Sequence, residues 1–169
     1  ALRQRPDILI VGETRGREAY TLFQAMATGH GGFSSIHADS VEATLTRLVS
    51  SPMDVPKALI ANTLDLITLQ LKLRINDKSI RRIIKIAEID GLDEKTGEIK
   101  THDIFKWNPN GDVHEYYGDS LVLEKIKEKT GVTDDQIAHE LKKRKTALDW
   151  LAQNNIRSHK GVMENILEF

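Results

Sequence analysis

A carboxylate directly follows a short apolar run near the amino end of the sequence. Residues 8–11 read Ile-Leu-Ile-Val, and Gly12 and Glu13 come next. A carboxylate held rigidly at the end of a buried strand can orient an attacking water or the water shell of a Mg²⁺ ion, as phosphoryl transfer requires. A glutamate in this place can equally cap a helix or form a salt bridge, so Glu13 taken alone leaves both interpretations open.

Two histidines lie on either side of a glycine turn farther along the chain. His30 precedes a Gly-Gly pair, and His37 is expected at the end of a strand over residues 33–38. A histidine there can hydrogen-bond a terminal phosphate, because its ring titrates near neutral pH. If this strand lies beside the one before Glu13, then Glu13 and His37 project from the same sheet edge. His30, on the turn, could contact phosphate from the side or bridge to a neighbouring subunit.

Two arginines, Arg15 and Arg17, follow Glu13 closely. Their planar guanidinium groups could make two-pronged contacts with a phosphate or a neighbouring carboxylate. Exposed arginines at the start of a helix are an equally good interpretation. The basic run at residues 142–145 is interpreted as a solvated helix face. The four other histidines are interpreted as structural residues.

Other kinds of site find little support in the sequence. A zinc site made of His30, His37 and Asp39 would lack the His-Glu-x-x-His spacing of a helical metal site. Ser34 and Ser35 do not belong to a Gly-x-Ser-x-Gly nucleophile elbow. The chain has no cysteine, which excludes disulfides, thiolate metal sites and cysteine nucleophiles.

The composition is that of a globular chain with balanced charge. The 169 residues are 40% hydrophobic, and the formal net charge is -1. A basic field that would attract nucleic acid is therefore not expected. The longest mainly apolar stretch, residues 57–73, is interrupted by polar side chains, and no secretory signal is visible, so we expect a soluble protein. Because the chain begins with Ala1 and a strand follows at once, we also expect a piece of a longer protein.

Apolar periodicity predicts an α/β fold in which strands and helices first alternate and an antiparallel meander follows. The β-α-β-α order of the first part implies a parallel sheet. The continuous apolar run at residues 8–11 predicts a strand that is buried on both faces. The expected strands cover residues 8–11, 33–38, 67–75, 80–90, 98–107 and 112–117, and the expected helices cover 17–28, 39–50, 57–64, 119–131, a segment after 133, and 160–167.

Two helix starts have sequence signatures of a reciprocal cap. Asp39 with Glu42 is expected to cap the helix up to residue 50, and Thr133 with Gln136 the long helix near the carboxyl end. The boundary between an α/β core, residues 1–118, and a small helical tail, residues 119–169, is expected near Gly118.

The acidic strand end and the two histidines, taken together, resemble a known family. The segment from Arg5 to Leu48, RPDILIVGETRGREAYTLFQAMATGHGGFSSIHADSVEATLTRL, is similar to the Walker B and histidine-box region of type II/type IV secretion-system ATPases. The resemblance is strongest to the archaeal branch that drives pilus, archaellum and secretion assembly. It covers residues 3 to about 48 closely, and the hairpin THDIFKW and the helix ELKKRKTALDWL also resemble that branch.

The resemblance implies the carboxyl-terminal part of a RecA-like ATPase domain that works as a homo-hexameric ring. ATP would bind with Mg²⁺ at subunit interfaces, and hydrolysis would move subunits against a membrane platform protein at the cytoplasmic face of the cell membrane. It also implies that Glu13 is the Walker B acid, preceded by Gly12, and that His30 and His37 are histidine-box residues. Mg²⁺ would be held through Glu13 and water.

The sequence departs from the family pattern in two places. It contains no G-x-x-x-x-G-K-[ST] loop to cradle the phosphates, and no aspartate stands directly before Glu13. We therefore expect the chain alone to be close to inactive. The alternatives are a non-catalytic adaptor that binds a ring or platform, and a DNA-translocating relative, which the balanced charge disfavours.

Overall fold

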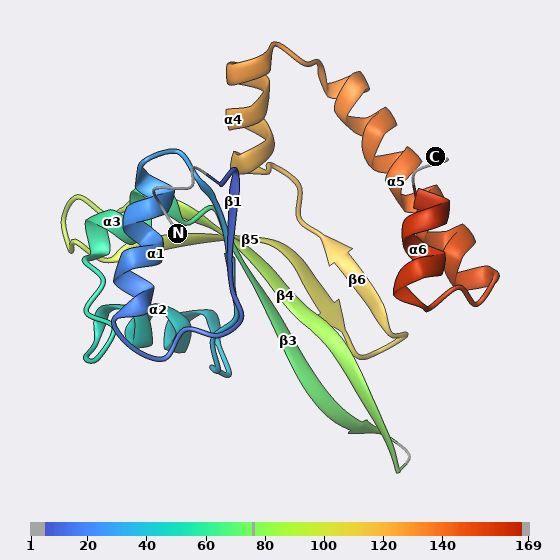
Figure 1. The fold of residues 1–169 in the computed structure, drawn as a ribbon, viewed down its shortest axis with the longest axis horizontal. Coiled ribbons are helices and arrows are strands. Elements are labelled where there is room, and N and C mark those ends of the chain that lie inside the picture. The colour runs from blue at the N-terminus through green and yellow to red at the C-terminus, as the bar shows by residue number, and fades with distance from the viewer. Residues whose placement is uncertain (1–5, 76, 167–169) are drawn as a thin grey trace. The chain divides into compact units, whose positions relative to one another are not determined.

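The computed structural model describes residues 6–75 and 77–166. The chain divides into two compact units, Ala1–Leu121 and Val122–Phe169. Within the first unit, β1 (Ile8–Val11), α1 (Glu18–Ala27) and β2 (Gly31–Ser34) follow one another, and β1 pairs with β2 in parallel (Figure 1). The predicted parallel pairing is confirmed.

The prediction that the first strand is buried on both faces is wrong. Ile10 is 77% exposed and its partner across the pair, Phe33, is 64% exposed. Among the described residues, β2 is the sole strand that pairs with β1, and α1 packs against β2 on one face. The apolar run predicted a strand correctly, but the burial of both faces depends on neighbours that the run itself does not specify.

The second strand is also shorter than predicted. The parallel ladder ends where Val11 pairs with Ser34, because Gly12 already leaves β1. His37 therefore lies in the loop that follows β2, three residues beyond its last paired position. The segment predicted as strand over residues 35–38 is loop.

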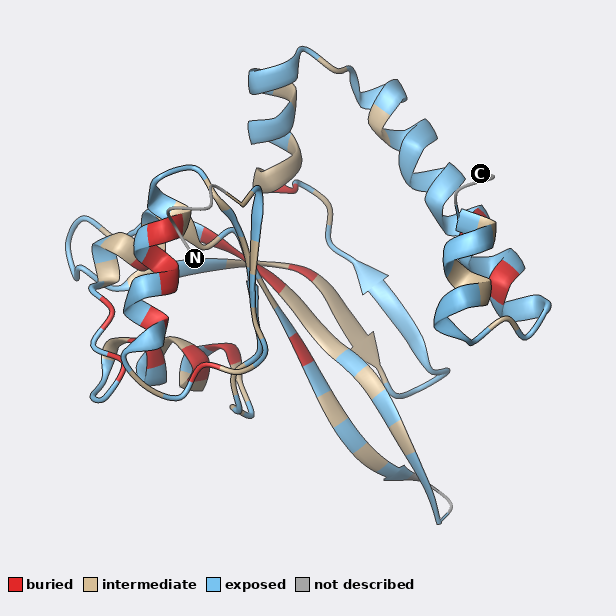
Figure 2. Cartoon of the chain, in the orientation of Figure 1, coloured by how far each residue is buried: buried red, intermediate tan, exposed pale blue. Residues whose placement is uncertain are grey.

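Three helices form the core of the first unit together with the loops between them. They are α1, α2 (Val41–Val49) and α3 (Lys57–Thr63), and Figure 2 shows buried residues gathered on them. The core cluster consists of Ala19, Phe23, Leu48, Met53, Val55 and Ile60. The predicted cap of α2 is wrong by one residue, because the side chain of Ser40, not Asp39, accepts the N–H of Ala43 at 2.9 Å.

An antiparallel meander completes the first unit, as predicted. Its strands are β3 (Leu66–Ile75), β4 (Lys78–Leu92), β5 (Ile99–Asn108) and β6 (Val113–Tyr116), and they lie in the order of the sequence (Figure 1). In β3, Leu69 is buried while Thr68 and Gln70 beside it are exposed, which is the alternation expected of a strand with one apolar face.

The second unit is helical. Its helices are α4 (Leu121–Thr130), α5 (Asp134–Gln153) and α6 (His159–Ile166). The predicted capping box is present at the start of α5: the Thr133 hydroxyl accepts the Gln136 N–H, and the Gln136 side chain accepts the Thr133 N–H. Ala147 and Leu151 of α5 are buried. The mixed α/β class with a parallel pair, antiparallel hairpins and a helical end is thus confirmed. No described helix is both long and apolar enough to cross a membrane.

Candidate functional site

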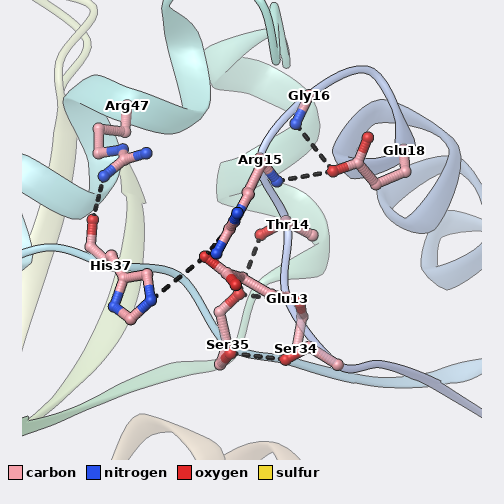
Figure 3. Close-up of polar contacts among 10 residues, drawn as sticks. Glu13, Thr14, Arg15, Gly16, Glu18, Ser34, Ser35, His37 and Arg47 are labelled. Atoms are coloured by element: carbon pink, nitrogen blue, oxygen red, sulfur yellow. Dashed lines mark hydrogen bonds and ion pairs between the residues drawn. The ribbon is translucent and has the colours of Figure 1, made fainter.

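Two loops at the carboxyl ends of β1 and β2 are joined by hydrogen bonds. The Ser35 hydroxyl donates to the Gly12 carbonyl at 2.6 Å, and the Thr14 N–H donates to the Ser35 carbonyl at 2.9 Å. The Thr14 hydroxyl donates to the same carbonyl at 3.2 Å, and Thr14 is buried. These bonds continue the contact between the strands beyond the ladder, so the two loops hold a defined position against each other (Figure 3).

Glu13, Arg15 and His37 meet at the edge that these loops form. Arg15 Nε lies 2.6 Å from Glu13 Oε1, and His37 Nε2 lies 3.3 Å from the same oxygen (Figure 3). The carboxylate side chain is 26% exposed, whereas the imidazole of His37 is 81% exposed. The cluster therefore has a partly sheltered carboxylate at its centre and solvent-accessible donors around it.

The charge state of Glu13 is set by its neighbours. The hydrogen bond from Arg15 lowers the pKa of the Glu13 carboxyl below its ordinary value, partial burial opposes this, and the charges of Arg15, His37 and Arg47 lower it further. The same contact raises the pKa of the Arg15 guanidinium. Glu13 is therefore ionised at neutral pH, which suits a hydrogen-bond acceptor or general base and not a proton donor.

Arg47 belongs to the cluster, although no motif in the sequence pointed to it. It lies in the last turn of α2 and donates a hydrogen bond to the backbone carbonyl of His37 (Figure 3). Thr14 and Ser35 were also missed as contributors. The available signal was weak, because a polar side chain that binds a backbone carbonyl of a distant loop has no fixed sequence spacing.

The loop after Glu13 is anchored to the start of α1. Glu18 Oε1 accepts the backbone N–H groups of Arg15 at 2.6 Å and Gly16 at 2.8 Å. These and its own backbone N–H lower the pKa of the Glu18 carboxyl, with the Arg15 N–H contributing most. Glu18 thus fixes the backbone of Arg15, and the Arg15 side chain pairs with Glu13.

The structure places Arg17 apart from the Glu13 cluster. Arg17 occupies the N-cap position of α1, where its side chain makes no capping hydrogen bond. It lines a pocket of about 300 Å³ together with Tyr20, Met53 and Asp54. Of the two arginines predicted for the site, Arg15 alone reaches Glu13.

The structure also separates His30 from Glu13. His30 Nδ1 lies 3.1 Å from the Ala25 carbonyl and 3.2 Å from the Thr28 hydroxyl, at the end of α1. The next residue, Gly31, pairs with Ile8 at the beginning of β1. In a parallel pair both strands begin at one edge, so His30 lies at the edge opposite to Glu13.

The donor set at the edge suits a phosphate with a hydrated metal ion. Arginine and histidine N–H groups are phosphate ligands, and a carboxylate is a Mg²⁺ or water ligand. Within residues 6–75 and 77–166, no group of three or more His, Cys, Asp or Glu side chains could hold a metal ion by itself.

Comparison with known proteins identifies the family. Residues 1–167 match the family model for type II/IV secretion system proteins. The chain belongs to this family. The resemblance seen in the segment from Arg5 to Leu48 is thereby confirmed.

Several individual proteins are similar to parts of the chain. The uncharacterized protein MJ1287 of Methanocaldococcus jannaschii is 46% identical over 144 residues, which are 85% of this chain and 53% of that protein. The type IV secretion system protein PtlH of Bordetella pertussis is 34% identical over 103 residues, 54% of this chain and 30% of that protein. The VirB11 ATPase of the Brucella suis type IV secretion system is 28% identical over 50% of this chain and 29% of the VirB11 chain, with a TM-score of 0.43.

The chain spans about half the length of MJ1287 and about a third of PtlH. The similarity therefore covers a part of each of these relatives and not its whole length.

Proposed function

We propose that this chain supplies the acidic and histidine half of the ATP site in a motor ATPase that powers secretion or filament assembly. The main support for this proposal is that Glu13, Arg15 and His37 lie together at one edge of the parallel strand pair. Ligands of α/β folds bind at the carboxyl ends of parallel strands, which is where this cluster lies. The phosphate-binding loop comes from outside these 169 residues in this proposal.

Glu13 acts as the acceptor for the attacking water. Its lowered pKa keeps it ionised at neutral pH, so it can accept a hydrogen bond from the water and orient it toward the phosphorus atom. In the structure, the Arg15 guanidinium forms an ion pair with Glu13 Oε1. When a phosphate binds, the Arg15 guanidinium moves its hydrogen bond from the Glu13 carboxylate to a phosphate oxygen. The Glu13 carboxylate can then accept a hydrogen bond from the attacking water.

His37 acts as a donor to the terminal phosphate. Its ring is exposed and already directs Nε2 to the Glu13 carboxylate, so a phosphate oxygen beside Glu13 lies within its reach. Glu13 would hold Mg²⁺ through water, and the ion would neutralise charge on the phosphate oxygens. Arg17 and His30 lie away from this cluster and are proposed to contact neighbouring subunits.

The working form is proposed to be a homo-hexameric ring at the cytoplasmic face of the cell membrane. ATP would then bind between subunits, and a membrane platform protein would be the mechanical partner. Membership of the type II/IV secretion system family supports this assignment. Nucleic acid is not a proposed partner, because the formal net charge of -1 gives no general attraction to phosphate backbones.

The test is MgATP binding and steady-state hydrolysis by the protein in which these residues are joined to a phosphate-binding loop. Glu13→Gln should lower turnover about 10²–10⁴-fold and leave nucleotide binding largely intact, because it removes a base and keeps the shape. Glu98→Gln is the matched control, since Glu98 is an exposed acid paired with Lys57 far along the chain.

Each outcome decides between the two functions. Loss of turnover in Glu13→Gln alone supports the motor ATPase. A protein that binds no nucleotide, with or without the substitution, is the adaptor that binds a ring or platform without catalysis. Equal turnover of Glu13→Gln and Glu98→Gln would contradict the role given to Glu13.

A further inference from the structure

His37 has few anchors of its own. The ladder of β2 ends at Ser34, so the backbone that carries His37 is loop, and the ring is 81% exposed. An exposed side chain on a loop can be displaced together with its backbone, and this freedom would weaken a contact that must form in one geometry. The hydrogen bonds of Ser35 hold the loop two residues before His37, and a further contact at His37 itself would fix the part that carries the ring.

The α2 helix is a rigid support close to this loop. Val41, Thr44 and Leu48 are buried on one of its faces, and the Ser40 side chain caps its first turn. Arg47 lies in the last turn of the same helix, ten residues after His37. Its guanidinium donates to the His37 carbonyl, so the loop is tied to a helix whose own place is set by packing.

Arg47 also acts on the carboxylate at the centre of the cluster. Its positive charge is one of the causes that lower the pKa of Glu13, after the larger contribution of Arg15. One side chain thus fixes the histidine backbone and favours the ionised state of the glutamate.

We propose that Arg47 is the positioning residue of this site: it holds the His37 loop so that the imidazole faces Glu13. The proposal rests on the proposed function for its catalytic consequence, but the positioning itself can be tested without nucleotide. Arg47→Met keeps an unbranched side-chain stem and removes the donor, whereas Arg47→Lys keeps a donor and a charge.

The first experiment reads the coupling of positions 13 and 37 by NMR of the chain. Glu13→Gln should shift the ring resonances of His37, because the carboxylate beside Nε2 is replaced by an amide. In an Arg47→Met background the same change should leave the His37 resonances nearly unmoved, and in Arg47→Lys the shift should return. A full His37 response in Arg47→Met would overturn the proposal.

The second experiment measures turnover of MgATP by the protein joined to its phosphate-binding loop. Arg47→Met should lower kcat by about tenfold to a hundredfold with little change in KM, since misplacement of a catalytic group by about 1 Å has effects of this size. Arg47→Lys should recover most of the loss. The matched control is Arg74→Met, which removes an exposed arginine paired with Asp77 on the meander.

The two hypotheses fail in different ways. If Glu13→Gln leaves turnover unchanged, the proposed function is wrong, and the NMR coupling still decides the role of Arg47. If Glu13→Gln abolishes turnover while Arg47→Met equals the Arg74→Met control, the site is catalytic and the positioning role of Arg47 is wrong. Equal unfolding temperatures of the Arg47 variants would exclude a general loss of structure as the cause.

Discussion

Two glutamates in the first unit are held in opposite ways. Glu13 lies at the carboxyl edge of the strand pair, where its partners are the largely exposed side chains of Arg15 and His37. Glu88 lies in β4 and is 4% exposed, and its carboxylate accepts the Ser120 hydroxyl at 2.5 Å and the Leu121 N–H at 2.6 Å. The first carboxylate can exchange its partners with a ligand, and the second cannot do so without local unfolding.

The difference bears on the function proposed for the Glu13 edge. Glu88 is held by a hydroxyl and a backbone N–H that the chain itself places at the start of α4, so its hydrogen bonds form once, during folding. The donors around Glu13 are on side chains that can turn toward solvent or toward an incoming anion. Changes at the Glu13 edge should therefore affect activity, and changes at the Glu88 junction should affect stability.

A large loss of turnover is expected at His37. If the proposed function holds, His37→Ala in the protein joined to a phosphate-binding loop should lower turnover of MgATP by about 10²–10³-fold, the usual cost of losing a donor to the developing charge of a transition state. Because the ring is 81% exposed, the unfolding temperature should stay the same. Steady-state kinetics and thermal unfolding of the same preparations check both statements. If His37→Ala lowered the unfolding temperature and left turnover unchanged, the distinction between the Glu13 edge and the Glu88 junction would be wrong.

A large loss of stability is expected at Glu88. Glu88→Ala should lower the free energy of unfolding by about 2–4 kcal/mol, because the buried hydroxyl of Ser120 and the N–H of Leu121 would lose their acceptor. Urea unfolding followed by circular dichroism measures it. Glu13→Ala serves as the matched variant and should change the same quantity much less, and equal losses at the two positions would contradict the distinction.

A smaller loss is expected where β2 packs against α1. A Cβ added at Gly32 would lie 2.3 Å from Sδ and 2.6 Å from Cγ of Met26. Gly32→Ala should therefore lower the free energy of unfolding by about 1 kcal/mol, because the flexible thioether can move aside at a modest cost. Gly12→Ala is the control, since its Cβ would meet nothing within 4 Å. Urea unfolding of the two variants should separate them.

The subtlest effect is a change in titration. Arg15→Met should raise the pKa of Glu13 toward its ordinary value, because the largest cause of the lowering is removed. Since the folded-state pKa lies below the unfolded one, the Arg15 contact stabilises the chain above the ordinary glutamate pKa, and this is lost as pH falls through the lowered pKa. Carboxyl-carbon NMR across the acid range measures the shift. An unchanged Glu13 titration would show that Arg15 does not govern this carboxylate.

Much of the local structure could be predicted from the sequence. The apolar run ahead of Gly12 predicted β1, the clean alternation from Ile67 onward predicted β3, and Thr133 with Gln136 predicted the cap of α5. These features depend on residues that are close together in the chain. The family resemblance likewise rested on contiguous residues, and the comparisons confirmed it.

The sequence by itself determined the strand and helix order, the family and the residue types available for chemistry. Only the tertiary structure decided that Ser40 caps α2, that the faces of Ile10 and Phe33 stay exposed, and that His30 and His37 lie at opposite edges of the strand pair. It also decided that Arg47 reaches the His37 carbonyl from α2. The physical reason is that periodicity and caps act within a few residues, whereas burial, sheet edges and side-chain contacts depend on how distant segments are folded together.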